Sequence, residues 1–446
     1  MSNPISDALN HEMSRRRFLG VVGIAGVSTL AVGALSPRFA FATPEDPKTG
    51  DVIVHIFLRG GIDGLGVLAP CNNASYKNYR NGSLLKDGTG KDISFTSDLR
   101  LNGSDANPVA ATDLFLHPEM KPLYDGAWKD TKLAIIPACG IREAVTLSHF
   151  EAERMLADGS AKRQPAGLMN RFAGAVNTDR LTAVGVGAAM PLAFEGTGRV
   201  FGFTSKPEFA VSGFQNSVSA TTALKSLYST NSTAVSDMGG KTIDVVNDVQ
   251  TKVPAYVSPA LGTLYRKGGS LGAQLKQTAD LIRANVGLRS VGITLGGWDT
   301  HAVDVAALDQ TIDGVKTSRL SRLANALQAF YQDLGQGMNE VTVLVVSEFG
   351  RTVKVNESGG TDHGRGTVMM VMGGKVNGGI RGGYPADWTK LPMPGSERSD
   401  AIPVLTDFRT VMAEVLVRRG GVSTETLSSI LPTYDNKPAW LGVVNY

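Results

Sequence analysis

Five segments of the chain consist almost entirely of apolar residues and end at glycine or polar residues. They cover residues 51–60, 132–140, 290–298, 341–346 and 366–374. A strand with one face in solvent alternates apolar and polar residues, whereas a strand buried on both faces is continuously apolar. The five segments are therefore predicted to be interior strands of one sheet.

Helices are predicted between these strands. The first begins with Ser148 at an expected N-cap, carries Glu151 at the capping-box position and ends at Gly159. Further helices are expected at 270–285, 320–335 and 407–418. Because helices alternate with continuous apolar strands, the pattern predicts an α/β fold, with a mostly parallel central sheet covered by helices on both faces.

Two long segments interrupt this alternation, at 72–107 and 191–251. Both are rich in Ser, Thr, Gly and Asn, and we interpret them as insertions that form a small cap. The prediction is therefore a single α/β domain over residues 43–446, preceded by a separate N-terminal segment, 1–42.

The N-terminal segment is typical of an export signal. The basic stretch "SRRRFLG" at 14–20 precedes a weakly apolar run at 21–35, and "AFA" follows at 40–42. The run is shorter than the roughly 20 residues that a membrane-spanning helix needs. The paired arginines resemble a twin-arginine signal, although an uncleaved anchor is the alternative. We expect a periplasmic or secreted protein that starts near Thr43, has no stable membrane span and meets the twin-arginine translocase during export.

Composition narrows the function. The net charge is +3 and no basic block stands out, so nucleic acid is not an expected partner. The two cysteines, Cys71 and Cys139, form no C-x-x-C motif, which excludes a zinc site built from cysteines. An oxidising compartment permits a disulfide between them, and the sequence leaves open whether it forms.

The predicted strands are followed by side chains that can bind a metal or a substrate. In open α/β sheets ligands bind beyond the carboxyl ends of the strands. In chain order the candidates are Asp63, Thr146, Ser148, His149, Asp299, His301, Glu348, Arg351, Asp362, His363 and Arg365. Carboxylates together with imidazoles suit zinc, manganese or iron better than calcium or magnesium.

Each candidate also has an ordinary structural interpretation. Asp63 lies among glycines and could be a turn residue. Asp299 could cap a helix, Glu348 could form an ion pair with Arg351, and His363 could be a polar loop residue. Their occurrence at one expected sheet edge favours a common site. The metal ligands predicted from the sequence are Asp63, His149, Asp299, His301, Glu348 and His363.

The motifs "FLRGGIDGL", "LSHFEAE", "GWDTH", "SEFGRT" and "GTDHGRG", behind a twin-arginine-like signal, resemble the bacterial domain-of-unknown-function family 1501. That family is similar to the alkaline phosphatase-like superfamily. The resemblance implies one or two metal ions at the carboxyl edge of the sheet, bound by residues such as Asp63, Asp299, His301 and His363. It also implies a hydroxyl nucleophile at a helix N-terminus, with Ser148 as the first choice and Thr146 as the second.

The chain departs from the superfamily pattern in three places. Asp299 and His301 form Asp-x-His where the superfamily has Asp-x-x-x-His, and Glu348-Phe349 replaces Asp-His, so one imidazole is missing. His149 is a candidate to replace it. The stretch "CGIRE" lacks the proline of a Cys-x-Pro-x-Arg motif, which disfavours a formylglycine sulfatase.

The resemblance implies an exported hydrolase or transferase that depends on zinc or manganese. Its substrate would be a small-molecule or polymer phosphate ester, with sulfate esters as the second choice. Arg351 or Arg365 would clamp the phosphoryl oxygens. The alternative is a non-catalytic periplasmic binding or assembly protein that keeps the fold. A nucleotide-dependent oxidoreductase is disfavoured, because "LRGGIDGLG" lacks the G-x-G-x-x-G spacing.

Overall fold

The computed structural model describes residues 50–71, 73–80, 114–143, 146–176, 181–196, 200–205, 217–229, 234–252, 259–303, 305–383, 400–434 and 440–446. The predicted export signal, 1–42, and most of the predicted insertion at 72–107 lie outside these residues. Among the described residues, no helix is both long enough and apolar enough to cross a membrane.

All five predicted strands are present and lie in one nine-stranded sheet, in the order β12-β4-β11-β10-β1-β7-β5-β6, with β13 paired to β4. Its strands are β1 (Val52–Leu58), β4 (Leu133–Gly140), β5 (Ala183–Val186), β6 (Val200–Phe203), β7 (Ser290–Leu295), β10 (Val341–Val346), β11 (Thr367–Gly373), β12 (Gly379–Ile380) and β13 (Thr406–Asp407). Short two-stranded sheets are formed by β2 (Leu68–Ala69) with β3 (Phe115–Leu116) and by β8 (Leu308–Ile312) with β9 (Val315–Ser318).

The central sheet is mostly parallel, as predicted. Strand β1 is parallel to both of its neighbours, β10 and β7, and β5 continues the parallel order. Strand β11 is antiparallel to its two partners, β10 and β4. The start of β11 therefore lies at the same sheet edge as the carboxyl ends of the parallel strands.

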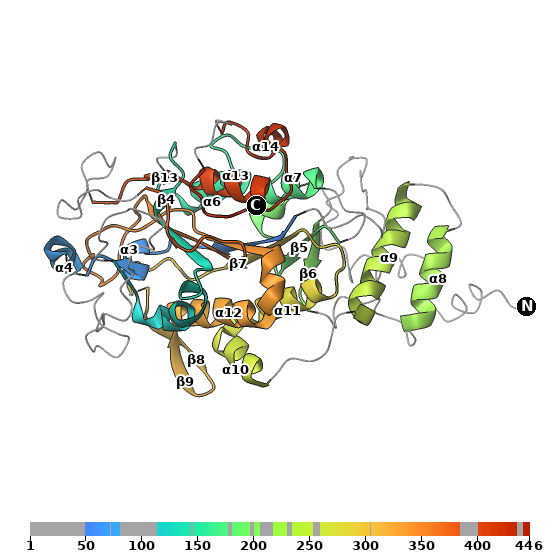
Figure 1. Cartoon of the computed structure of the whole chain (residues 1–446), viewed down its shortest axis with the longest axis horizontal. Coiled ribbons are helices and arrows are strands. Elements are labelled where there is room, and N and C mark those ends of the chain that lie inside the picture. The colour runs from blue at the N-terminus through green and yellow to red at the C-terminus, as the bar shows by residue number, and fades with distance from the viewer. Residues whose placement is uncertain are drawn as a thin grey trace, which may run out of the picture.

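Helices α11 (Gly269–Arg283) and α12 (Arg319–Leu334) cover one face of the sheet, and α7 (Leu168–Ala175) and α13 (Phe408–Arg418) cover the other (Figure 1). The other described helices are α3 (Gly64–Val67), α4 (Ala74–Arg80), α5 (Lys121–Leu123), α6 (His149–Asp158), α8 (Ser217–Ser229), α9 (Ala234–Lys252), α10 (Pro259–Lys267) and α14 (Thr424–Ile430). The predicted helices correspond to α6, α11, α12 and α13. Short 3-10 or π turns occur at Pro118–Met120, Tyr124–Trp128, Leu192–Phe194 and Gly335–Glu340.

Two apolar cores lie on opposite faces of the sheet, which explains the continuous apolar strands. Along β1, Val54 and Ile56 belong to the core beneath α11 and α12, whereas Ile53 and Phe57 belong to the core beneath α7 and α13. Successive side chains of a strand point to opposite faces, so each residue of β1 must be compatible with a buried environment. This two-sided burial fixes the position of the strand ends that carry the site.

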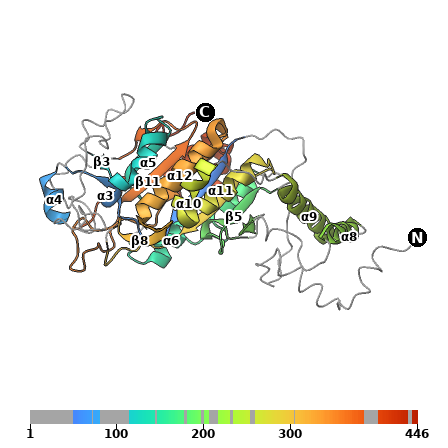
Figure 2. The ribbon, with the colours of Figure 1, turned by 90° about the horizontal axis from the view of Figure 1, so that it is seen from below.

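The predicted insertion at 191–251 has two parts. Strand β6 pairs in parallel with β5 and extends the central sheet. Helices α8 and α9 lie side by side at the end of the molecule opposite α3 and α4 (Figures 1 and 2).

Both cysteines are free and buried, so no disulfide joins Cys71 to Cys139. Cys139 lies at the end of β4, and its Sγ contacts the sulfur of Met369 at 3.8 Å. Burial raises the pKa of both thiols, Cys71 and Cys139, above the ordinary value. The two residues belong to different apolar clusters, which explains why the permitted disulfide is not formed.

Candidate metal centre

The candidate residues come together because neighbouring strands end at the same level. Leu58, the last residue of β1, is in register with Leu295 at the end of β7, and Phe57 is in register with Val346 at the end of β10. The loops that follow these strands therefore leave the sheet side by side. The N-terminus of α6 and the loop that leads into β11 complete the group.

Three histidines in this group are held in one tautomer. Nδ1 of His149 lies 2.7 Å from Oε1 of Glu348, Nδ1 of His301 lies 2.9 Å from Oδ1 of Asp362, and Nδ1 of His363 lies 2.6 Å from the carbonyl oxygen of Leu147. Each partner is a hydrogen-bond acceptor, so each Nδ1 carries the proton that it donates. In the neutral ring, the lone pair is then on Nε2.

The Nε2 atoms of the three histidines are directed at Asp299. Its Oδ1 lies 3.4 Å from Nε2 of His149, 3.1 Å from that of His301 and 3.7 Å from that of His363. The Nε2 atoms of His301 and His363 are 2.9 Å apart. Nε2 of His149 is buried and has no hydrogen-bond partner among the described residues. Lone pairs that face each other at this distance require a proton or a metal ion between them.

The distances fit a metal ion of the zinc type. Two ligand atoms about 2.0–2.1 Å from a tetrahedral zinc ion lie about 3.3 Å apart, and the four separations given above lie on both sides of that value. His149, Asp299 and His363 each place one ligand atom within 4.8 Å of the others, and His301 adds a nitrogen next to His363. Imidazoles whose Nδ1 is bound to a carboxylate or carbonyl are the usual arrangement at such sites. These residues therefore fit a bound divalent metal.

Asp299 is positioned by Arg351. A terminal nitrogen of Arg351 lies 2.5 Å from Oδ1 of Asp299, and the guanidinium also donates to the carbonyl oxygens of Gly60, Gly61 and Thr361. Burial by itself would raise the pKa of Asp299, but the hydrogen bond and charge of Arg351, together with the neighbouring histidines, hold it below the ordinary value. Asp299 is therefore ionised and ready to bind a cation.

The histidines differ in their protonation. The hydrogen bond to Glu348 raises the pKa of His149 despite the opposing effect of burial. Burial lowers the pKa of His363, against the opposing effect of its hydrogen bond to the carbonyl of Leu147. At a given pH, His149 therefore carries a second ring proton in a larger fraction of molecules than His363 does, and a metal ion must displace that proton in order to bind.

Glu348, predicted as a metal ligand, lies behind His149 and not among the converging atoms. Its side chain is fully buried. Oε1 accepts hydrogen bonds from His149 and, at 2.8 Å, from the backbone N–H of Gly60, and Oε2 contacts the Ser347 hydroxyl at 3.0 Å. No contact joins Glu348 to Arg351 among the described residues. Glu348 thus acts on the site by orienting His149.

Phe349, the residue after Glu348, packs on two of the three histidines. The centre of its ring lies 4.7 Å from that of His149 and 4.9 Å from that of His363. Gly61 has φ +69°, and a Cβ there would lie 2.6 Å from the Phe349 ring. At Gly60 (φ +128°) a Cβ would lie 2.3 Å from the backbone nitrogen of Asp299. These glycines let the first loop pass close to Asp299 and Phe349.

Asp63, also predicted as a ligand, is not brought to the group. Both of its carboxylate oxygens accept hydrogen bonds from Arg80, at 2.6 and 3.0 Å. The side chains are 2% and 0% exposed, so this is a buried ion pair. It fixes α4 against the start of α3, and Asp63 is not among the residues whose ligand atoms converge.

The predicted clamp residues are also constrained. The Arg351 side chain is fully buried and its donors are used within the protein, so it cannot reach a substrate. Arg365 is buried, and one terminal nitrogen donates to the carbonyl oxygen of Arg142 at 3.3 Å. Arg365 lines a small, open hollow with Ile141, Thr146, Ala152, Glu348, Phe349 and Val404.

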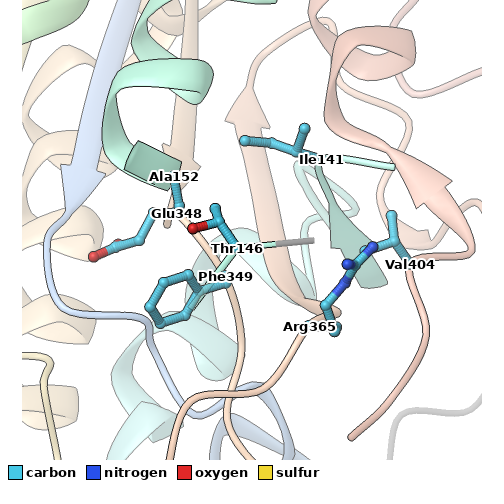
Figure 3. A pocket seen from close by; sticks show the side chains of 7 residues that line it. All are labelled: Ile141, Thr146, Ala152, Glu348, Phe349, Arg365 and Val404. Atoms are coloured by element: carbon cyan, nitrogen blue, oxygen red, sulfur yellow. The ribbon is translucent and has the colours of Figure 1, made fainter. Parts of the chain in front are cut away.

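The two candidate nucleophiles differ in their surroundings. In the view of Figure 3, Thr146 lies between Glu348 and Arg365, and the Glu348 carboxylate points away from Arg365. The Thr146 hydroxyl donates to a carboxylate oxygen of Glu151 at 2.7 Å and accepts from the Ser148 N–H at 3.1 Å. Ser148 precedes α6 as predicted, but its side chain is exposed and makes no capping hydrogen bond.

The chain is similar to known proteins in one segment and in its general fold. Residues 263–389 match the model of the family described as "Protein of unknown function (DUF1501)". This confirms the predicted family over that segment. No curated protein matches the chain.

Solved structures resemble the chain only distantly. The C-terminal periplasmic domain of EcEptC from Escherichia coli is 11% identical, with 90% of this chain and 92% of that chain covered and a TM-score of 0.34. Ps i-CgsB is 9% identical, with 89% of this chain and 77% of that chain covered and a TM-score of 0.33. Alkaline phosphatase from the Antarctic bacterium TAB5 is 11% identical, with 73% of this chain and 91% of that chain covered and a TM-score of 0.24. At these values the likeness says nothing about the ligand or reaction of this chain.

Proposed function

We propose that the chain is an exported, metal-dependent hydrolase or transferase that acts on phosphate esters, with sulfate esters as the second choice. The observation that supports this most is the convergence of three imidazole Nε2 atoms on the Asp299 carboxylate, with each Nδ1 held by an acceptor. His149, Asp299, His301 and His363 would hold the metal, zinc or manganese. Glu348 and Asp362 would orient the rings.

A metal bound there would polarise the ester oxygen and stabilise the charge that develops on it. The residues of the chain supply the remaining chemistry. Thr146 is a better placed nucleophile than Ser148, because its hydroxyl lines the hollow and already donates to a carboxylate. In the first step the Thr146 oxygen would bond to phosphorus and its proton would pass to Glu151. The bond from phosphorus to the leaving oxygen would break, and the alkoxide would take up a proton from water and depart as the alcohol. Water would then hydrolyse the phosphothreonine and release phosphate.

The export proposal rests on the sequence of residues 1–42. A twin-arginine signal would carry the folded chain across the membrane, so the metal could be bound before export. The partners would be the twin-arginine translocase and, afterwards, a small-molecule or polymer ester in the periplasm or outside the cell.

Metal content is the primary test. Mature protein purified from the periplasm should retain one divalent metal per chain after dialysis, measured by mass spectrometry of the elements. Asp299→Ala and His363→Ala should lose it, whereas the exposed control Asp313→Asn should keep it. Wild-type protein that retains no zinc or manganese, and gains no thermal stability when either is added, would refute the metal proposal.

Activity is the second test. Release of phosphate from a panel of monoesters should be lost in Thr146→Val and largely kept in Ser148→Ala. The opposite result would assign the nucleophile to Ser148.

A non-catalytic metal-binding protein is the second candidate, and one observation favours it. Phe349 packs on two of the histidine rings, so a second metal has no obvious ligands beside it. Metal-loaded wild type that releases neither phosphate nor sulfate from any ester of the panel would favour this candidate.

A further inference from the structure

Arg59 is the first residue after β1, and its side chain is 48% exposed. Its backbone is fixed beside the metal ligands. The Arg59 N–H donates to the carbonyl of Leu295 at 2.9 Å, and the Arg59 carbonyl accepts from the N–H of Trp298 at 3.2 Å. Trp298 directly precedes Asp299, so the chain positions of Arg59 and Asp299 are held together at the ends of β1 and β7.

The Arg59 side chain is held on its other side by α6. Its Nε donates to Oε2 of Glu153 at 2.9 Å. Glu153 lies one helical turn after His149 on the same face of α6. Burial raises the pKa of Glu153, Arg59 lowers it, and the charge of Glu348 raises it further. Glu153 therefore lies next to His149 on α6, and its hydrogen bond to Arg59 places Arg59 at the edge of the proposed metal centre.

The Arg59 guanidinium has unused donors. Within the part of the chain that the structure describes, only its Nε has a hydrogen-bond partner. The two terminal nitrogens, with four N–H groups, are left for another acceptor. Arg351 is fully buried and saturated by backbone acceptors, and Arg365 is buried beside the Arg142 carbonyl. Of these three arginines, Arg59 combines exposure, free donors and a fixed position.

We propose that Arg59 binds the non-bridging oxygens of a tetrahedral oxyanion at the metal centre, with Glu153 holding the guanidinium through Nε. The ligand class is a phosphate or sulfate ester, and inorganic phosphate or sulfate would bind in the same way. The planar fork of arginine suits two oxygens of such an anion. The inference rests on the proposed function, since the ester would be shared by Arg59 and the metal.

The test is calorimetric titration of inorganic phosphate, and separately of inorganic sulfate, into the mature protein with and without bound zinc. Arg59→Ala should weaken phosphate binding by about tenfold to a hundredfold, because hydrogen bonds to a charged group are lost. Arg59→Lys should recover part of this through its charge. Glu153→Gln should strengthen binding, because a negative charge next to the anion is removed while the amide oxygen still accepts from Nε.

Two further variants separate binding from folding. Arg266→Ala removes another exposed arginine that pairs with a carboxylate, that of Asp313, and it should bind phosphate like the wild type. Arg59→Ala leaves Glu153 buried without its partner, so the double variant Arg59→Ala/Glu153→Gln removes both groups. It should show the wild-type near-ultraviolet circular dichroism spectrum and still bind phosphate weakly.

The results distinguish this inference from the proposed function. Equal phosphate affinity in Arg59→Ala and wild type, or no binding of either anion by zinc-loaded wild type, would overturn the role of Arg59 and leave the metal centre unaffected. Phosphate binding that depends on Arg59 in a protein that never retains metal would support Arg59 and refute the metal proposal. Tighter binding of sulfate than phosphate would assign sulfate esters as the ligand class.

Discussion

Glu348→Gln is the substitution that best tests how the metal centre is held. Glutamine has nearly the same shape as glutamate. Its amide oxygen can accept from the Gly60 N–H and from His149 Nδ1, as Glu348 Oε1 does at 2.8 and 2.7 Å. Its amide nitrogen would face the Ser347 hydroxyl and can donate to it. The change therefore removes the negative charge behind His149 and keeps the packing.

The expected loss follows from the role of Glu348 as the partner of a metal-binding imidazole. Loss of such a partner usually weakens metal binding by about 10- to 100-fold, which corresponds to about 1.4–2.8 kcal/mol. Zinc affinity can be measured by competition with a chromophoric chelator. Glu357→Gln, an exposed glutamate in the same loop, should bind zinc like the wild type.

The pH dependence gives a second, independent readout. Glu348 raises the pKa of His149, so a proton competes with zinc for this ring until the pH passes a value above about 6.5. Zinc affinity of the wild type should rise through that pH and then level off. In Glu348→Gln the rise should move to lower pH, because the amide cannot stabilise the charged ring. The difference in zinc affinity between wild type and Glu348→Gln should therefore be largest at alkaline pH.

Stability of the metal-free protein has the opposite dependence on pH. A histidine whose pKa is raised in the folded state stabilises the fold fully below its unfolded-state pKa, and this contribution is lost as the pH rises through the folded-state value. The difference in unfolding free energy between wild type and Glu348→Gln should therefore narrow with rising pH. An unchanged zinc affinity together with an unchanged pH midpoint would refute the orienting role of Glu348.

Three other predictions concern residues around the site. Arg351→Lys should lower the unfolding free energy by about 3 kcal/mol in urea titrations, because one ammonium group cannot satisfy the buried carbonyls that the guanidinium serves; an unchanged midpoint would contradict this. Asp63→Asn should cost about 3–5 kcal/mol, because Arg80 stays buried without its charge partner, yet it should leave metal content unchanged; loss of metal would return Asp63 to the ligand set. Unreduced, denatured protein should react with a thiol reagent at both Cys71 and Cys139 and folded protein at neither, whereas no reaction after denaturation would indicate a disulfide.

The strands and the sheet edge could be predicted from the sequence because two-sided burial gives continuous apolar segments that few other structures produce. The antiparallel direction of β11 could not, since its apolar pattern is the same in either direction. Strand β6 could not be recognised from the sequence, because "VFGF" is short and follows a polar segment. Its place in the sheet depends on pairing with β5.

The site was predicted as a list of residues, and the structure divides that list by role. Arg351 is close to Glu348 in sequence, which suggested a local ion pair, but its partner is Asp299 in another loop. Asp63 was listed for its place after β1, and its pairing with Arg80 depends on where α4 packs. Asp362 and Arg59 stand inside the motifs "GTDHGRG" and "FLRGGIDGL", but the sequence does not show that Asp362 orients a histidine or that Arg59 lies beside the group. The roles of orienting and ligating residues depend on tautomers, which only three-dimensional contacts reveal.

The direction of β11 has a consequence for how this protein can diversify. Parallel neighbours need a connection that crosses back over the sheet, but β10 and β11 are joined by a loop, 347–366, that stays at one edge. This loop supplies Glu348 and Arg351 near its start and Asp362 and His363 near its end. The Gly350 N–H donates to the carbonyl of Arg365 and the Thr352 N–H to the carbonyl of Asp362, so the two ends of the loop are bonded to each other. Insertions or deletions at the tip of the loop, near Glu357 and Ser358, would therefore leave the sheet and both halves of the site in place. This loop can therefore change in length at its tip without loss of the fold or of the candidate site.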